Sequence, residues 1–84
     1  MRTYHEIVGH IQLVIEDVSL GKLPAESVNE DDRLISDLGL DSLDYATVFL
    51  ECESWLGIHI REDVVDWSQI TTISQIAILL MQEQ

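Results

Sequence analysis

Basic side chains are scarce in this sequence: four Lys and Arg residues stand against sixteen Asp and Glu residues, for a formal net charge of −12. A chain this acidic is not expected to bind nucleic acid and is disfavoured at anionic membranes, because both are themselves negatively charged. Residues 26–66 hold twelve acidic and two basic side chains, so ten of the twelve net charges fall there. This clustering predicts partner proteins with basic patches.

Cysteines and long apolar runs are lacking as well. The single Cys52 excludes an intrachain disulfide, and with three scattered histidines it makes no zinc pattern, so we expect no metal site. No apolar run approaches the ~20 residues of a bilayer-spanning helix, and the N-terminus does not read as a secretory signal. At 84 residues the chain has room for one domain, residues 1–84. We expect a cytoplasmic monomer.

Three longer helices are predicted from apolar periodicity and capping residues. The first spans residues 4–20, opened by a capping box of Thr3 and Glu6 and stopped near Gly21. The second spans residues 42–56. The last runs from a second capping box, Thr72 and Gln75, through about residue 82. A short, weakly amphipathic helix is predicted over residues 62–67, so the expected fold class is all-α.

A long segment, residues 21–41, separates the first two helices and has no clean period. Apolar side chains such as Val28, Leu34 and Ile35 are expected to anchor it to the core. A loop this long in a small domain is uncommon unless it has a functional role. The role that we predict for it is to place Ser42 at the tip of the domain.

The motif DLGLDSL, residues 37–43, carries the strongest functional signal. Asp41 is a good N-cap, and Ser42 would then occupy the first position of the second helix, with Asp44 adding negative charge to the first turn. A serine there is exposed beside unpaired backbone N–H groups and the positive end of the helix dipole, which suit a phosphate ester. For the Asp-Ser dipeptide alone, a simple helix cap is the competing interpretation.

With this motif, the chain resembles the acyl carrier protein family over most of its length. The resemblance also covers the first helix, the acidic loop, the helix through Trp55, the turn at residues 56–60 and the entry to the last helix at residues 70–73. It implies a four-helix acyl-carrier bundle in which Ser42 bears a covalent 4′-phosphopantetheine arm. The implied partners are a phosphopantetheinyl transferase, an acyl- or aminoacyl-loading enzyme, and synthases or transferases with basic docking patches.

The resemblance also assigns two groups of side chains on and around the second helix. Its outer face is expected to dock partner enzymes through Asp41, Leu43, Asp44, Ala46, Thr47, Leu50, Glu51 and Glu53. A pocket that opens for an acyl chain is expected among Val48, Cys52, Leu56, Ile60, Ile76 and Leu80. Thr47 and Ser54 stand where many fatty-acid carriers have glutamates, so this docking face is less acidic than usual.

The expected function is to shuttle acyl intermediates, as thioesters, between fatty-acid, polyketide or related biosynthetic enzymes. Catalysis by Ser42 is not expected, because no Gly-x-Ser-x-Gly elbow surrounds it and no histidine has a relevant spacing. A specialised aminoacyl or peptidyl carrier is the nearer alternative, favoured weakly by the aromatic set Tyr45, Phe49, Trp55 and Trp67. An unmodified acidic docking module is the farther one, and the intact DLGLDSLD motif opposes it.

Overall fold

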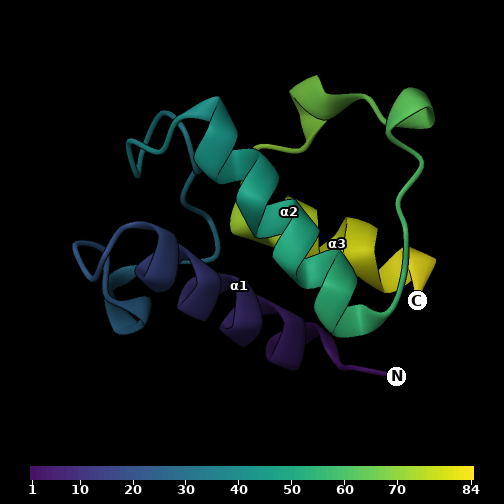
Figure 1. Cartoon of the computed structure of the whole chain (residues 1–84), viewed down its shortest axis with the longest axis horizontal. Helices are drawn as coiled ribbons and strands as arrows, with labels where there is room; N and C mark the ends of the chain where they lie inside the picture. The colour runs from purple at the N-terminus through teal and green to yellow at the C-terminus, as the bar shows by residue number, and fades with distance from the viewer.

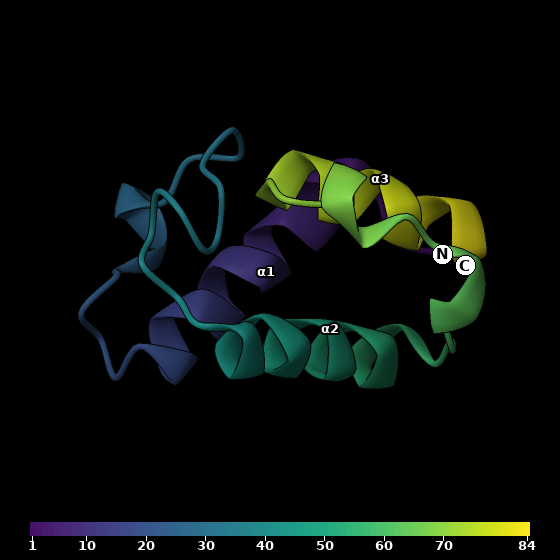
Figure 2. The ribbon, with the colours of Figure 1, turned by 90° about the horizontal axis from the view of Figure 1, so that it is seen from above.

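Three α-helices form the framework of the molecule in a computed structural model that describes all 84 residues (Figure 1). They are α1 (Tyr4–Val18), α2 (Ser42–Leu56) and α3 (Ile73–Glu83), and no strand is present. Helix α1 contacts both α2 and α3. Figure 2 shows the two chain ends close together, where the Arg2 amide donates to Gln84 Oε1. None of the helices combines the length and the apolar character that crossing a membrane requires.

The capping residues set the helix ends largely as the sequence predicts. Both predicted capping boxes are present, and α2 has the predicted bounds, with Gly57 as its C-cap at a left-handed φ of 69°. Helix α1 stops at Val18, two residues before its predicted end, because Leu20 and Gly21 both have positive φ, 56° and 81°. Two consecutive left-handed residues cannot continue an α-helix.

The predicted fourth helix, over residues 62–67, is not confirmed. That segment contains two separate 3₁₀ turns, η2 (Glu62–Val64) and η3 (Trp67–Gln69), and Val65 between them is extended. Each turn has three residues, and η2 has no side-chain cap. Since a short helix is marginal without tertiary packing, and Val64 is exposed, nothing here favours a continuous α-helix.

A single hydrophobic cluster holds the three helices together, and the long loop contributes to it. The apolar periodicity of the sequence predicts one inward face for each of α1 and α2, and both are confirmed because every member is buried or half-buried. The members are Tyr4, Ile7, Val8, Ile11, Ile15 and Val18 of α1, and Tyr45, Val48, Phe49, Cys52 and Leu56 of α2. From residues 21–41, Val28, Leu34 and Leu40 are buried in the same cluster. Ile35, which was expected to anchor the loop, is instead 52% exposed.

Backbone hydrogen bonds fasten this loop to the start of α3. The Leu34 amide donates to the Thr71 carbonyl (3.0 Å), and the Ser74 amide donates to the Glu30 carbonyl (2.8 Å). A third short 3₁₀ turn, η1 (Ala25–Ser27), lies near its beginning and contacts α1. The loop is therefore a packed part of the molecule that leads the chain back to the first turn of α2.

Candidate functional site

The chain enters α2 through a tight turn that fixes the position of Ser42. Gly39 has a φ of 75°, a left-handed conformation that glycine adopts without a side-chain clash. Leu40 is buried, and its amide donates to the Leu34 carbonyl (3.0 Å). An anchored residue thus lies two positions before Ser42, which is itself exposed at the first position of the helix.

Ser42 has the surroundings that a phosphodiester requires. Asp41 caps α2, with its Oδ1 atom accepting from the Asp44 amide (2.8 Å). The Ser42 hydroxyl forms no hydrogen bond within the chain, and the amides of Ser42 and Leu43 are likewise unpaired. Unpaired amides at the positive end of a helix dipole stabilise an attached anion. The residues present therefore fit a phosphate group linked to Ser42 Oγ.

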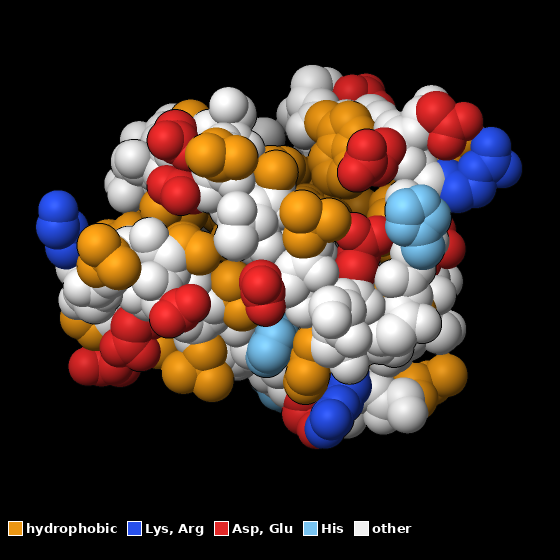
Figure 3. Space-filling model, in the orientation of Figure 1, with side chains coloured by type: hydrophobic (Ala, Val, Ile, Leu, Met, Phe, Trp, Pro, Cys, Tyr) orange, Lys and Arg blue, Asp and Glu red, His pale blue; other side chains and the backbone are white.

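Most side chains of the predicted docking group lie on the outer side of α2. Asp41, Ala46 and Glu51 are exposed, while Asp44 and Thr47 are half-buried. Leu43 and Leu50 are 74% and 62% exposed, so the face is apolar at its centre. Figure 3 shows hydrophobic side chains among carboxylates on the face over α2 and the segment that follows it.

Glu53 does not belong to this exposed group, although the sequence placed it on the docking face. The residue is 8% exposed, and its Oε2 atom accepts a hydrogen bond from the Ile60 amide (2.6 Å). The Ile60 amide lies on the segment after α2, and pairing with it draws the carboxylate inward. Its spacing in the sequence could have indicated this inward position, because Glu53 lies four and eight residues after the inward-facing Phe49 and Tyr45.

The side chains predicted to form an acyl pocket are a closed part of the core. Val48, Cys52, Ile60, Ile76 and Leu80 are buried, and Leu56 is half-buried. Burial, followed by the nearby charges of Glu51 and Glu53, raises the pKa of the Cys52 thiol to about 12. In this conformation these side chains fill the space between the helices, so whether they part for a cargo stays a prediction.

An open groove lies instead between α2 and the segment containing η2 and η3. Its volume is about 200 Å³, and its lining residues are mostly hydrophobic: Tyr45, Ala46, Phe49, Leu50, Glu53, Ile60, Glu62 and Trp67. A second hollow shares Tyr45 and Trp67 with it and extends to Ile70 and Ile35. The periodicity of α2 could not reveal this groove, because its other wall comes from the segment of η2 and η3, which has no helical periodicity of its own.

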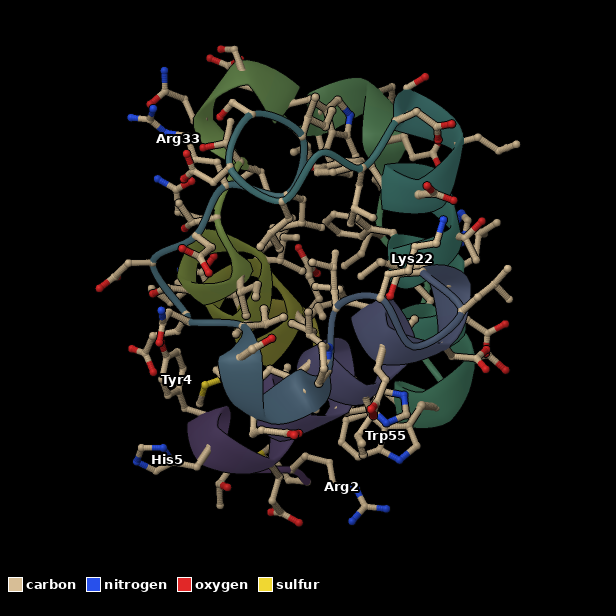
Figure 4. All side chains as sticks on the ribbon, turned by 90° about the vertical axis from the view of Figure 1, so that its left-hand side faces the viewer. Arg2, Tyr4, His5, Lys22, Arg33 and Trp55 are labelled. Carbon is tan, nitrogen blue, oxygen red and sulfur yellow. The ribbon has the colours of Figure 1, made fainter.

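The aromatic residues of α2 have two different environments. The Trp55 ring stacks on His10, with 4.0 Å between ring centroids, and the Arg2 guanidinium lies 4.7 Å from the Trp55 centroid (Figure 4). Burial lowers the pKa of His10. Phe49, by contrast, packs edge-on against Trp67 in the groove wall. Trp55 therefore fastens α2 to α1, whereas Trp67 helps to form the groove.

No group of His, Cys, Asp and Glu side chains is arranged to hold a metal ion. His59 lies beside Glu53, with 3.5 Å between its Nδ1 atom and Glu53 Oε2, and its side chain is mostly exposed. His5 packs edge-on against Tyr4 near the start of α1. The three histidines of the chain are thus placed in three different environments.

Comparison with known proteins identifies the family of the chain. The family model for the phosphopantetheine attachment site matches residues 15–80, most of the chain. The chain therefore belongs to the phosphopantetheine-binding family. Domains of this family are the sites of covalent 4′-phosphopantetheine attachment, so the protein is a carrier of that group. A search of curated proteins finds no match.

Proposed function

We propose that residues 1–84 form one non-catalytic carrier domain and that Ser42 is its attachment site. The observation that carries this proposal is the exposed Ser42 hydroxyl, without a hydrogen bond, beside two unpaired amides at the start of α2. In the attachment step Ser42 Oγ bonds to the pantetheine-bearing phosphorus of coenzyme A, the pyrophosphate bond breaks, and adenosine 3′,5′-bisphosphate leaves. A base of the transferase takes the hydroxyl proton. The attached group ends in a thiol, which holds the cargo as a thioester.

The outer side of α2 is the proposed surface for partner enzymes. Leu43, Ala46 and Leu50 follow one another at three- and four-residue spacing and form an apolar stripe. Asp41, Asp44 and Glu51 border that stripe with negative charge. A basic rim on a synthase or transferase would be steered towards these carboxylates, and the small apolar centre allows rapid release.

The proposed cargo is an acyl intermediate of fatty-acid, polyketide or related biosynthesis. The groove beside α2 supports this proposal, because it begins at Tyr45 and Ala46, one turn after Ser42, and its walls are mostly hydrophobic. An aminoacyl or peptidyl cargo is the second candidate. The observation that favours it is the Glu53 carboxylate in the groove, which an aliphatic chain does not need.

The experiment that tests the attachment site is intact mass spectrometry after incubation with coenzyme A, magnesium and a broad-specificity phosphopantetheinyl transferase. We expect the wild type to gain one phosphopantetheine and Ser42→Ala to gain none. Ser54→Ala is the matched control, because Ser54 is an exposed serine near the other end of α2. Both variants should keep the wild-type stability to within about 0.5 kcal/mol, as expected for surface substitutions.

Two outcomes would contradict the assignment. Loading of Ser42→Ala would place the phosphopantetheine on another residue. A folded wild-type protein that gains no mass with any transferase would instead favour the unmodified docking module. Loading of the wild type and Ser54→Ala, but not of Ser42→Ala, supports the assignment. Loading assays with acyl and aminoacyl donors would then identify the cargo.

A further inference from the structure

Glu53 is the one buried side chain of the chain that carries a charge. The remaining acidic residues are exposed or half-buried, whereas Glu53 is 8% exposed. Burying a carboxylate is unfavourable unless its oxygen atoms find hydrogen-bond donors. One oxygen, Oε2, accepts from the Ile60 amide at 2.6 Å, and His59 approaches that same oxygen. The other oxygen, Oε1, accepts no hydrogen bond within the chain and remains accessible to water, because no buried side-chain oxygen of the chain lacks a partner.

The free oxygen belongs to a side chain that lines the hydrophobic groove. Glu53 continues a row of α2 residues with Tyr45 and Phe49, all of which border the groove. Ser42 lies eleven residues earlier on the same helix, about 16 Å away along its axis. The phosphopantetheine arm is itself long enough to cover this distance. With the arm folded back along α2, a cargo that enters the groove past Tyr45 and Phe49 can bring its end group to the Glu53 carboxylate.

We infer that Glu53 is a specificity-determining residue that selects cargo with a hydrogen-bond donor, an ammonium or hydroxyl group, at the far end of the groove. This inference rests on the proposed attachment at Ser42. Between the mostly hydrophobic walls of this groove, an acceptor whose only other partner is water favours a cargo donor that pairs with it and disfavours an acceptor-only group. Hydrogen bonds to a charged acceptor are the stronger ones, so an ammonium group should respond more than a hydroxyl group.

A purely structural role for Glu53 makes a different prediction. If the carboxylate only fastens the turn after α2, any side chain that accepts from the Ile60 amide should serve equally well. Glu53→Gln separates the two roles, because its amide oxygen can accept from Ile60 while its amide nitrogen replaces the free oxygen. The variant keeps the bond to the turn and changes the free atom from an acceptor to a donor.

The test attaches to Ser42 a set of pantetheine analogues whose acyl chains have equal length and end in ammonium, hydroxyl, methyl ketone or methyl. Chains of four, six and eight carbons vary how far the end group extends from the thioester into the groove. Nuclear magnetic resonance of the loaded proteins gives the ratio of groove-bound to free cargo from the shifts of the groove residues. Glu62→Gln is the matched control, because Glu62 also lines the groove but is exposed.

For ammonium cargo we expect the bound-to-free ratio to fall about tenfold from wild type to Glu53→Gln, the factor that follows from one charge-assisted hydrogen bond. The ketone cargo should change in the opposite direction, the methyl cargo should not change, and hydroxyl cargo should change less than ammonium cargo. Glu62→Gln should leave all four ratios unchanged. Hydrogen exchange at the Ile60 amide checks that the turn is intact in Glu53→Gln.

Equal responses of ammonium, ketone and methyl cargo to Glu53→Gln would overturn the inference and leave Glu53 as a structural residue. In that case the mass gain at Ser42 would still support the proposed carrier function. A wild-type protein that accepts no analogue would overturn the proposed function and this inference together. If the Ile60 amide loses its protection from hydrogen exchange in Glu53→Gln, the variant no longer has an intact turn and the wild type is used instead. In the wild type, the inference requires that ammonium cargo, and none of the other three, shifts the carbon signal of the Glu53 carboxyl group.

Discussion

Two side chains with nucleophilic atoms lie ten residues apart on α2, and their surroundings give them opposite reactivity. The Ser42 hydroxyl is exposed at the helix start, where a transferase can reach it. The Cys52 thiol is completely buried, and its pKa is raised to about 12, mainly by burial. Since the thiolate is the reactive form, the Cys52 thiol is unreactive near neutral pH.

We predict that the native apo protein will not react with the thiol reagent DTNB at pH 8. The raised pKa leaves Cys52 as the thiol at this pH, and burial excludes the reagent. The absorbance of the released thiolate measures the reaction, and unfolding in guanidinium should expose one thiol per chain. After phosphopantetheine loading, the folded protein should show one fast-reacting thiol. Rapid reaction of the native apo protein would contradict the burial of Cys52.

At the scale of elements, the long connection between α1 and α2 behaves as part of the core. Leu34 is completely buried, and its backbone accepts and donates hydrogen bonds that tie residues 34–40 to the start of α3. The neighbouring Ile35 points into the second hollow and is half exposed. Of these two consecutive apolar residues, Leu34 therefore belongs to the core and Ile35 does not.

We predict that Leu34→Ala will lower the free energy of unfolding by about 2 to 5 kcal/mol, the usual loss for a large buried aliphatic side chain. Ile35→Ala is the matched control and should lose less than about 1 kcal/mol, because its side chain is already in contact with water. Urea denaturation followed by circular dichroism measures both. Equal losses for the two variants would show that the loop does not pack as described.

The whole molecule carries a net charge of −12 within dimensions of 30 × 25 × 19 Å. Its Arg–carboxylate ion pairs are few: Arg2 with Glu6, and Arg61 with Asp63. At 0.01 M ionic strength the Debye length is about 30 Å, as large as the molecule, so all of its carboxylates repel one another. Self-repulsion of this kind destabilises the compact state.

We predict that the melting temperature will rise as sodium chloride is increased from 0.01 to 0.5 M. Salt shortens the Debye length and weakens repulsion among the carboxylates, most of which are exposed. Differential scanning calorimetry measures the shift. A double variant, Glu26→Gln with Asp31→Asn, should show a higher melting temperature at low salt and a smaller rise. A melting temperature that does not depend on salt would refute repulsion as a limit on stability.

The parts of the fold that were predictable from the sequence depend on residues close together in the chain. Capping boxes join residues three apart, and helix faces join residues three and four apart, so both can be read locally. These signals predicted α2 from Ser42 to Leu56 and the starts of α1 and α3. They also predicted an exposed Ser42 at a helix N-terminus, the centre of the candidate site.

Only the tertiary structure decided what depends on distant partners. Glu53 turns inward because it pairs with the Ile60 amide, and the groove exists because the segment of η2 and η3 forms its second wall. The absence of a fourth α-helix likewise reflects tertiary packing, because the exposed Val64 leaves residues 62–67 without a buried face that would stabilise a short helix. A local pattern shows which side chains share one helix face, but it does not show what lies opposite them. The folded chain alone supplies that opposite partner.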